Sequence, residues 1–174
     1  MSGGMPTGSN TGNAGEFLVL TELLHRDFHA GLAERGNPVY DILARYGSRY
    51  TSLRVKASRS RKFQWSATGP GPGHLSLPGL HPNDETDFTV LVAFNDQGPR
   101  SAEIYIVPSL VVERTLTDAH EHYHRYPNRH TGRRRKRTNL RAIELDREDS
   151  EDIISRDFAR KWAEYREAWH LLRG

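Results

Sequence analysis

Two carboxylates and a lysine are the residues of this chain whose types and spacing best suit a chemical reaction. Glu16 lies at the start of the apolar run Phe-Leu-Val-Leu, Asp41 lies between Val-Tyr and Ile-Leu, and Lys56 ends the sequence Leu-Arg-Val-Lys. Two acids and a lysine, if brought together, can hold a divalent metal beside a phosphodiester and orient the attacking water. The trio therefore predicts metal-assisted hydrolysis of a phosphodiester.

The sequence around these residues predicts one helix and two strands. The helix is expected to begin after Asn13 as its N-cap and to end near Arg26, because apolar residues recur between them at helical spacing. Residues 39–44 and 50–57 have the composition of strands, and Gly47-Ser48 between them is typical of a hairpin turn. The two acids and the lysine would then lie on three successive elements.

The alternation of side chains along the second strand places Arg54 and Lys56 on one face and its apolar residues on the other. The basic pair would face a cleft that Asp41 can reach, and a buried Asp41 needs either Lys56 or a metal ion as its partner. A purely structural interpretation stays open, in which Asp41 and Lys56 form an ion pair and Glu16 caps its own helix by bonding back to Asn13.

The remaining elements favour an α/β fold with a mixed central sheet flanked by helices. They are a short strand at 63–66, a long Gly- and Pro-containing loop at 67–82, strands at 88–94 and 103–107 joined by a hairpin, and a helix at 111–124. We expect a single domain over residues 13–174, with a core at 13–108, after a disordered tail at 1–12.

A long amphipathic helix is expected at the C-terminal end of the chain, over residues 155–172. An aromatic and apolar stripe carries this prediction, because its members step by four and three residues: Phe158, Trp162, Tyr165, Trp169 and Leu172. Such a stripe is typical of core packing against a sheet.

Composition narrows the classes of protein to consider. The chain has 174 residues, enough for one domain with its own core, and it contains no cysteine, which excludes disulfides and thiolate zinc sites. It has no apolar stretch near the roughly 20 residues of a membrane span and no signal peptide pattern. We therefore expect a cytoplasmic protein that does not bind membranes.

A basic segment at 125–141 contains eight Lys or Arg residues and no acid. At its centre lies an unbroken run of cations: Arg133, Arg134, Arg135, Lys136 and Arg137. A local stripe of positive charge favours a polyanion such as nucleic acid, and phosphate contacts supply most sequence-independent affinity. We expect a basic loop that contacts DNA phosphates, although a solvated linker would have the same composition.

Three segments of the sequence together resemble the PD-(D/E)XK nuclease superfamily. They are Gly-Glu16 at the start of an apolar helix, Asn-Pro-Val-Tyr-Asp41, and Leu-Arg-Val-Lys56. The likeness is strongest to small prokaryotic members of the restriction-endonuclease-like and Holliday-junction-resolvase-like types. Residues 87–94 and 104–108 are similar to the third and fourth core strands of such proteins.

This resemblance implies a restriction-endonuclease-like core and roles for three residues. Asp41 would be the principal metal ligand, Glu16 the helix carboxylate that assists the metal or the water, and Lys56 the catalytic lysine. The implied metal is Mg²⁺ or Mn²⁺, and the implied substrate is DNA. A homodimer stays open.

Arg54 departs from the family pattern, which has Asp, Glu or Gln at this position. A guanidinium has five donors and no acceptor, so it cannot bind a metal, and it would compete with the cation for Asp41 or Glu16. Three outcomes stay open. Glu16 and Asp41 could hold the metal with waters, or the site could be inactive on an intact fold. In the third, an acid from elsewhere enters the site; the candidates are Asp84, Glu85 and Asp87.

A second motif, His120-Glu-His-Tyr-His124, fits the H-E-x-x-H pattern of a helical zinc site, with Glu121 as base and Glu144 as a third ligand. Pro127 ends the helix soon afterwards, which favours a solvated helix face. We thus expect a metal-dependent endonuclease acting on DNA. The alternatives are a catalytically inactive nucleic-acid-binding or partner-binding domain on the same fold and, less favoured, a small zinc hydrolase.

Overall fold

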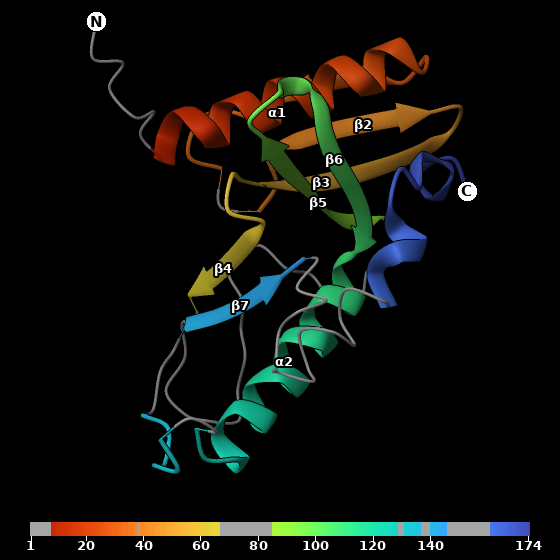
Figure 1. The fold of residues 1–174 in the computed structure, drawn as a ribbon. Helices are drawn as coiled ribbons and strands as arrows, with labels where there is room; N and C mark the ends of the chain where they lie inside the picture. The colour runs from red at the N-terminus through yellow and green to blue at the C-terminus, as the bar shows by residue number, and fades with distance from the viewer. Residues whose placement is uncertain (1–7, 38, 67–84, 129–130, 137–139, 146–160) are drawn as a thin grey trace, which may run out of the picture.

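A five-stranded mixed sheet in the order β1-β2-β3-β5-β6 forms the centre of the molecule (Figure 1). The structure is a computed structural model, and it describes residues 8–37, 39–66, 85–128, 131–136, 140–145 and 161–174. The strands of this sheet are β1 His29–Leu32, β2 Ile42–Tyr46, β3 Arg49–Ser58, β5 Asp87–Asn95 and β6 Gly98–Pro108. β3 and β5 pair in parallel and the other neighbours antiparallel, so the prediction of a mixed sheet is confirmed.

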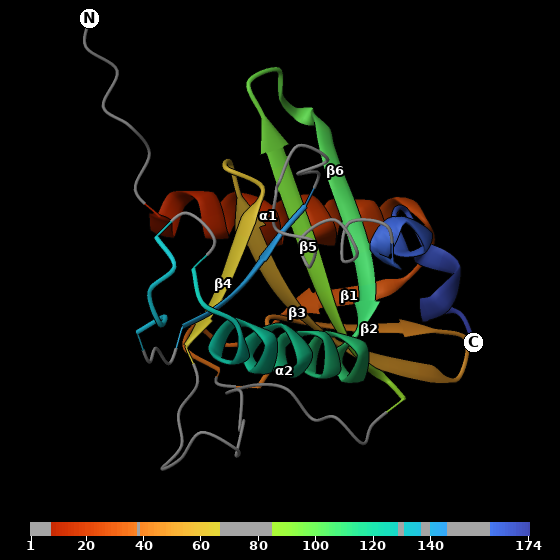
Figure 2. The same cartoon turned by 60° about the horizontal axis from the view of Figure 1, so that its bottom comes forward.

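Helices lie on both faces of this sheet, as Figure 2 shows. Helix α1, Gly8–His25, packs on one face, and α2, Ser109–Arg125, lies on the other together with a separate two-stranded sheet. That small sheet pairs β4, Lys62–Ser66, antiparallel with β7, Leu140–Glu144. Residues 88–94 of β5 are all buried, because both faces of this strand are covered.

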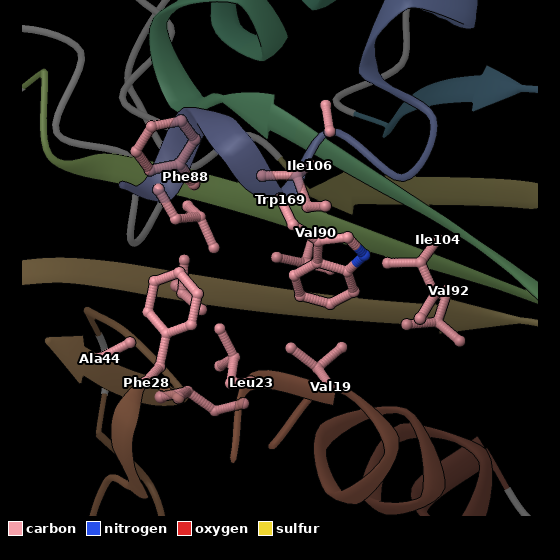
Figure 3. Packing of buried hydrophobic residues seen from close by; sticks show 14 of the residues in the cluster. Val19, Leu23, Phe28, Ala44, Phe88, Val90, Val92, Ile104, Ile106 and Trp169 are labelled. Atoms are coloured by element: carbon pink, nitrogen blue, oxygen red, sulfur yellow. The ribbon is translucent and has the colours of Figure 1, made fainter. Parts of the chain in front are cut away.

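The two faces of the sheet have separate hydrophobic cores. The first core lies under α1 and includes residues from α1, the sheet and the C-terminal segment, among them Leu23, Val90 and Trp169 (Figure 3). The second core includes Leu91 and Tyr105 from the opposite face of the same strands, together with residues of α2, β4 and β7. Alternate residues of β5 and β6 therefore serve different cores, as the period of a strand requires.

Several predicted boundaries are corrected by the structure. Helix α1 begins at Gly8, so residues 8–12 are helical rather than part of a tail, and Asn13 lies inside the helix instead of capping it. β2 begins at Ile42, so Asp41 precedes the strand rather than lying within it. β1 was not predicted, and β4 forms the second sheet instead of extending the first.

Within the described part, residues 161–162 are α-helical and the predicted C-terminal helix is wrong from Ala163 onward. Residues 163–165 and 169–172 form two short 3₁₀ turns, and between them Glu167 adopts a left-handed backbone with φ of 52°. Trp162 enters the second core and Trp169 the first, which one straight helix could not achieve. The expected core packing is nevertheless present for Trp162, Trp169 and Leu172; Phe158 lies outside the described residues.

No helix in the described ranges is long and apolar enough to cross a membrane.

Candidate active site

The candidate site lies where β2 stops and β3 continues. The β2–β3 ladder ends at the pair Ile42–Leu53, whereas β3 continues to Ser58 alongside β5. Asp41 occupies the position just beyond the ladder. Its backbone N–H donates to the Leu53 carbonyl at 2.9 Å, and its carboxylate Oδ2 accepts from the Val55 N–H at 2.7 Å. The Asp41 side chain thus replaces a strand as the hydrogen-bond partner of β3.

Arg54 lies beside this carboxylate. Its Nε is 3.6 Å from Asp41 Oδ2, the oxygen that already accepts the Val55 N–H. The side chains of Arg54 and Asp41 are 28% and 20% exposed. An ion pair of this separation and exposure contributes on the order of 1 kcal/mol or less to stability. Asp41 therefore has a cationic partner, but a weak one.

Lys56 lies on the same face of β3 as Arg54, two residues further along. Its Nζ is 5.1 Å from the centre of the Trp65 ring, close enough for a cation–π contact. Burial lowers the pKa of Lys56, the neighbouring Arg54 charge lowers it further, and Asp41 opposes the shift. Strand β4 therefore covers the lysine and holds its ammonium group next to the Asp41–Arg54 pair.

Glu16 reaches the site from α1, which approaches β3 closely. A Cβ atom added at Gly15 would lie 2.6 Å from the Cβ of Ala57, so only glycine allows this spacing. Burial raises the pKa of Glu16, the negative charge of Asp41 raises it further, and Arg54 lowers it. The two carboxylates are therefore near enough to repel each other.

The structure thus places Asp41 between the other residues singled out in the sequence: it lies beside Arg54 and acts electrostatically on both Glu16 and Lys56. Glu16 belongs to the helix side of β3, Asp41 lies at its edge, and the basic pair projects from the opposite face. The alternative in which Glu16 caps its helix through Asn13 is excluded, because both residues lie inside α1. Asp41 pairs with Arg54, and Lys56 also lies within its electrostatic range.

The donor set fits a hard divalent cation that keeps most of its waters. Mg²⁺ is commonly held by one or two carboxylates, and the mutual repulsion of Glu16 and Asp41 is what a shared cation would relieve. A site made of three or more protein ligands is not present within the described residues, because no three His, Asp or Glu side chains gather there. Asp41 and Glu16 are thus the residues that would hold the ion.

Two of the three acids considered as replacements lie in the described part of the chain, and neither joins this pair as a third ligand. The Asp87 carboxylate accepts a hydrogen bond from the Ser52 hydroxyl at the start of the β3–β5 ladder. Glu85 is exposed, and Asp84 lies outside the described residues. Within the described residues, neither Asp87 nor Glu85 therefore forms a three-carboxylate cluster with Glu16 and Asp41.

The H-E-x-x-H motif lies on α2, but its residues differ in exposure. His120 is buried in part by the ring of His124, whose centre is 4.3 Å away, whereas Glu121 is exposed. The expected solvated face is therefore wrong for His120. Neither Glu144 nor any other third ligand gathers with this motif within the described residues, which leaves the zinc alternative unsupported.

The basic segment lies beside the C-terminal end of α2 (Figure 1). Its anchor is Arg135, whose guanidinium lies 4.6 Å from the centre of the Tyr123 ring. The Asn128 N–H donates to the Arg133 carbonyl at 2.9 Å, which fixes the turn before the run. Arg137 lies outside the described residues, and three side chains are exposed: Arg133, Arg134 and Lys136.

Two contributors to the site were not assigned a role from the sequence. Gly15 immediately precedes Glu16, and its signal is a glycine inside a helical pattern, which indicates close packing against another element. Trp65 lies two residues after Phe63 on a short strand, a spacing that indicates burial on a shared face but not the contact with Lys56.

No family model and no curated protein matches this chain. Among solved structures, the bacterial homing endonuclease I-Ssp6803I is similar over 97% of this chain and 94% of its own, with a TM-score of 0.52 and 16% identity. Hjc, a Holliday junction resolvase of the archaeal hyperthermophile Archaeoglobus fulgidus, is similar over 76% of this chain and 83% of its own, with a TM-score of 0.43 and 16% identity. At these identities the likeness concerns the fold alone: the chain is similar in fold to the homing endonuclease, which agrees with the fold that its motifs predicted.

Proposed function

We propose that this protein is a metal-dependent endonuclease that hydrolyses DNA phosphodiesters. The observation that supports the proposal is the position of Asp41 just beyond the end of β2, where its carboxylate accepts the Val55 N–H, lies beside Arg54 and acts electrostatically on both Glu16 and Lys56. Two acids and a lysine are the residue types that metal-assisted phosphodiester hydrolysis requires, here on a fold similar to that of a homing endonuclease.

Each residue has a distinct part in this proposal. Asp41 and Glu16 would hold Mg²⁺ or Mn²⁺, which supplies Lewis acidity at the phosphate and a nucleophile near neutral pH. Asp41 is fixed for this role by the Val55 N–H, which orients its carboxylate. The Lys56 ammonium, held over Trp65, would stabilise the negative charge that develops on the phosphate oxygens.

The test of this function is cleavage of labelled duplex, branched and single-stranded DNA with Mg²⁺ or Mn²⁺, read on denaturing gels. Wild type is expected to cut at least one substrate, and chelation with EDTA should stop it. Asp41→Ala should abolish cutting because it removes the principal ligand. Failure of wild type to cut any substrate with either metal would refute the proposal.

A catalytically inactive DNA-binding domain is the second candidate, and the Arg54–Asp41 ion pair is the observation that favours it. In that case Arg54 and Lys56 would act only as phosphate-binding cations. DNA binding measured by anisotropy, without cleavage under any metal condition, would support this candidate over the first.

The basic segment supplies a further part of the proposed DNA contact. We expect about two to four phosphate contacts from it, so replacing Arg133, Arg134, Arg135, Lys136 and Arg137 by Ser should weaken binding similarly for all sequences. The slope of log affinity against log salt should flatten by roughly 0.9 per lost contact on duplex DNA. Unchanged affinity and slope would identify the segment as a solvated linker.

A further inference from the structure

The contact between Arg54 and Asp41 is loose enough for Arg54 to exchange Asp41 for another anionic partner. The separation of 3.6 Å between Nε and Oδ2 exceeds the length of a normal hydrogen bond, and both side chains keep part of their surface in water. The same oxygen already accepts the short bond from the Val55 N–H. A guanidinium can bind a phosphate through two parallel hydrogen bonds, a closer contact than the 3.6 Å separation between Arg54 and Asp41.

The charges around the edge of β3 give a reason for such an exchange. In their ordinary ionised forms, the two carboxylates and the two cations of the site add up to zero net charge. A divalent cation arriving alone would leave an excess of two positive charges next to Arg54 and Lys56. A backbone phosphate arriving with it would offset part of this excess and would offer Arg54 a new partner.

We propose that Arg54 couples metal binding to DNA binding: it pairs with Asp41 when DNA is absent and with a DNA phosphate when DNA is bound. Asp41 is then more available to the metal ion in the complex with DNA than in the free protein. The inference rests on the proposed function and assigns Arg54 the part of a positioning residue. Because coupling between two ligands is reciprocal, DNA should tighten metal binding by the same factor by which the metal tightens DNA binding.

The experiment measures Mn²⁺ binding to the full chain, with free Mn²⁺ read by electron paramagnetic resonance, in the absence and presence of saturating short duplex DNA. A DNA-only titration supplies the blank, and readings at 4 °C are taken before gels show product. Wild type is expected to bind Mn²⁺ about 5- to 150-fold more tightly with DNA, the usual range for such coupling. Arg54→Gln should bind Mn²⁺ more tightly than wild type without DNA, and DNA should change its affinity little.

Two variants serve as controls. Asp41→Ala should remove the specific Mn²⁺ binding in both conditions. Arg61→Gln removes an arginine from another ion pair of nearly equal exposure, with 27% for Arg61 and 23% for Glu103, and it should keep the coupling of wild type. Circular dichroism confirms that each variant is folded before its affinity is interpreted.

The outcomes separate this inference from the proposed function. Mn²⁺ affinity that does not respond to DNA in wild type, no Mn²⁺ binding with DNA, or no gain for Arg54→Gln would each overturn the coupling, whatever the cleavage gels show. Absence of DNA cleavage would overturn the proposed function, whatever the Mn²⁺ affinities show.

Discussion

Arg61–Glu103 and Arg54–Asp41 are two arginine–carboxylate pairs of similar exposure, and their geometries differ. Arg61 bonds Glu103 through both terminal nitrogens, at 2.8 and 3.3 Å, and the Tyr105 hydroxyl donates to the same carboxylate at 2.9 Å. Arg166 adds a further charge at 3.6 Å. The Asp41 carboxylate instead accepts its short bond from a backbone N–H and meets the Arg54 Nε at 3.6 Å.

This difference in geometry separates a structural ion pair from a carboxylate that can accept another cation. Glu103 joins the turn after β3, strand β6 and the C-terminal segment in one network, in which each donor fixes the others. Asp41 lies beyond the end of a strand ladder beside two cations and a second acid. A carboxylate with a loosely held partner can accept a new cation, whereas one in a closed network cannot do so without losing stability.

A substitution of Lys56 should have the largest effect in a comparison of the candidate site with the Arg61–Glu103 pair. Lys56→Ala removes the ammonium that would stabilise charge on the phosphate, so kcat should fall by about 10²–10³-fold. DNA affinity should change little. The measurement is single-turnover cleavage together with fluorescence anisotropy. Arg61→Gln, from the Arg61–Glu103 pair, is the matched control and should keep the turnover of wild type. Equal losses of turnover in the two variants would contradict the distinction between a structural pair and a catalytic site.

A substitution at Gly15 tests whether the close approach of α1 to β3 holds Glu16 near Asp41. Gly15→Ala places a Cβ 2.6 Å from the Ala57 Cβ, and such overpacking costs about 1–3 kcal/mol in the free energy of unfolding. Urea unfolding measures this loss, and cleavage should fall in parallel because Glu16 moves.

Gly12 supplies a control on the same helix. A Cβ at Gly12 meets nothing within 4 Å, so Gly12→Ala should raise the free energy of unfolding by about 0.5–1 kcal/mol through helix propensity alone. If both alanine variants are stabilised, α1 does not pack against β3 as closely as the structure indicates.

Much of the site's framework follows from local sequence patterns. The hairpin at Gly47, the buried strand β5 and helix α2 were predicted close to their observed bounds, because each has its period and its turn residues within a short stretch. For β6 only the buried end was predicted, because the strand begins at Gly98, five residues before the predicted start. Glu16, Asp41 and Lys56 were identified for the same reason. Each lies next to an apolar run that shows which element carries it.

The parts that could not be predicted depend on contacts between distant segments. β1 is short and largely exposed, so its residues show no alternation. The β4–β7 pairing joins Lys62 with Glu144, which no local pattern indicates. The C-terminal aromatic residues have helical spacing, but Trp162 and Trp169 belong to cores on opposite faces of the sheet. The backbone changes direction at Glu167, so that both side chains can reach their cores.

The pH dependence of stability gives the smallest expected effect and the sharpest comparison of the two sites. The hydrogen bond from Arg61 is the main cause that holds the pKa of Glu103 below its ordinary value, with Tyr105 and Arg166 adding to it and burial opposing. Its stabilisation is therefore fully present above the unfolded-state pKa, near 4.5, and is lost as pH falls through the lower folded-state pKa. Burial and the charge of Asp41 raise the pKa of Glu16, so ionised Glu16 instead destabilises the metal-free protein above that raised pKa.

Substitution by glutamine should consequently act with opposite signs at the two positions. At pH 7, Glu103→Gln should lower the free energy of unfolding and Glu16→Gln should raise it, both measured by urea unfolding in EDTA. The gain for Glu16→Gln should fade as pH falls towards 4.5, because protonation then makes the wild-type side chain neutral as well. The loss for Glu103→Gln should persist to lower pH, because its carboxylate stays ionised in the folded protein below 4.5. Effects of the same sign at pH 7 would mean that Glu16 is not held near Asp41, and the carboxylate pair proposed to hold the metal would not exist.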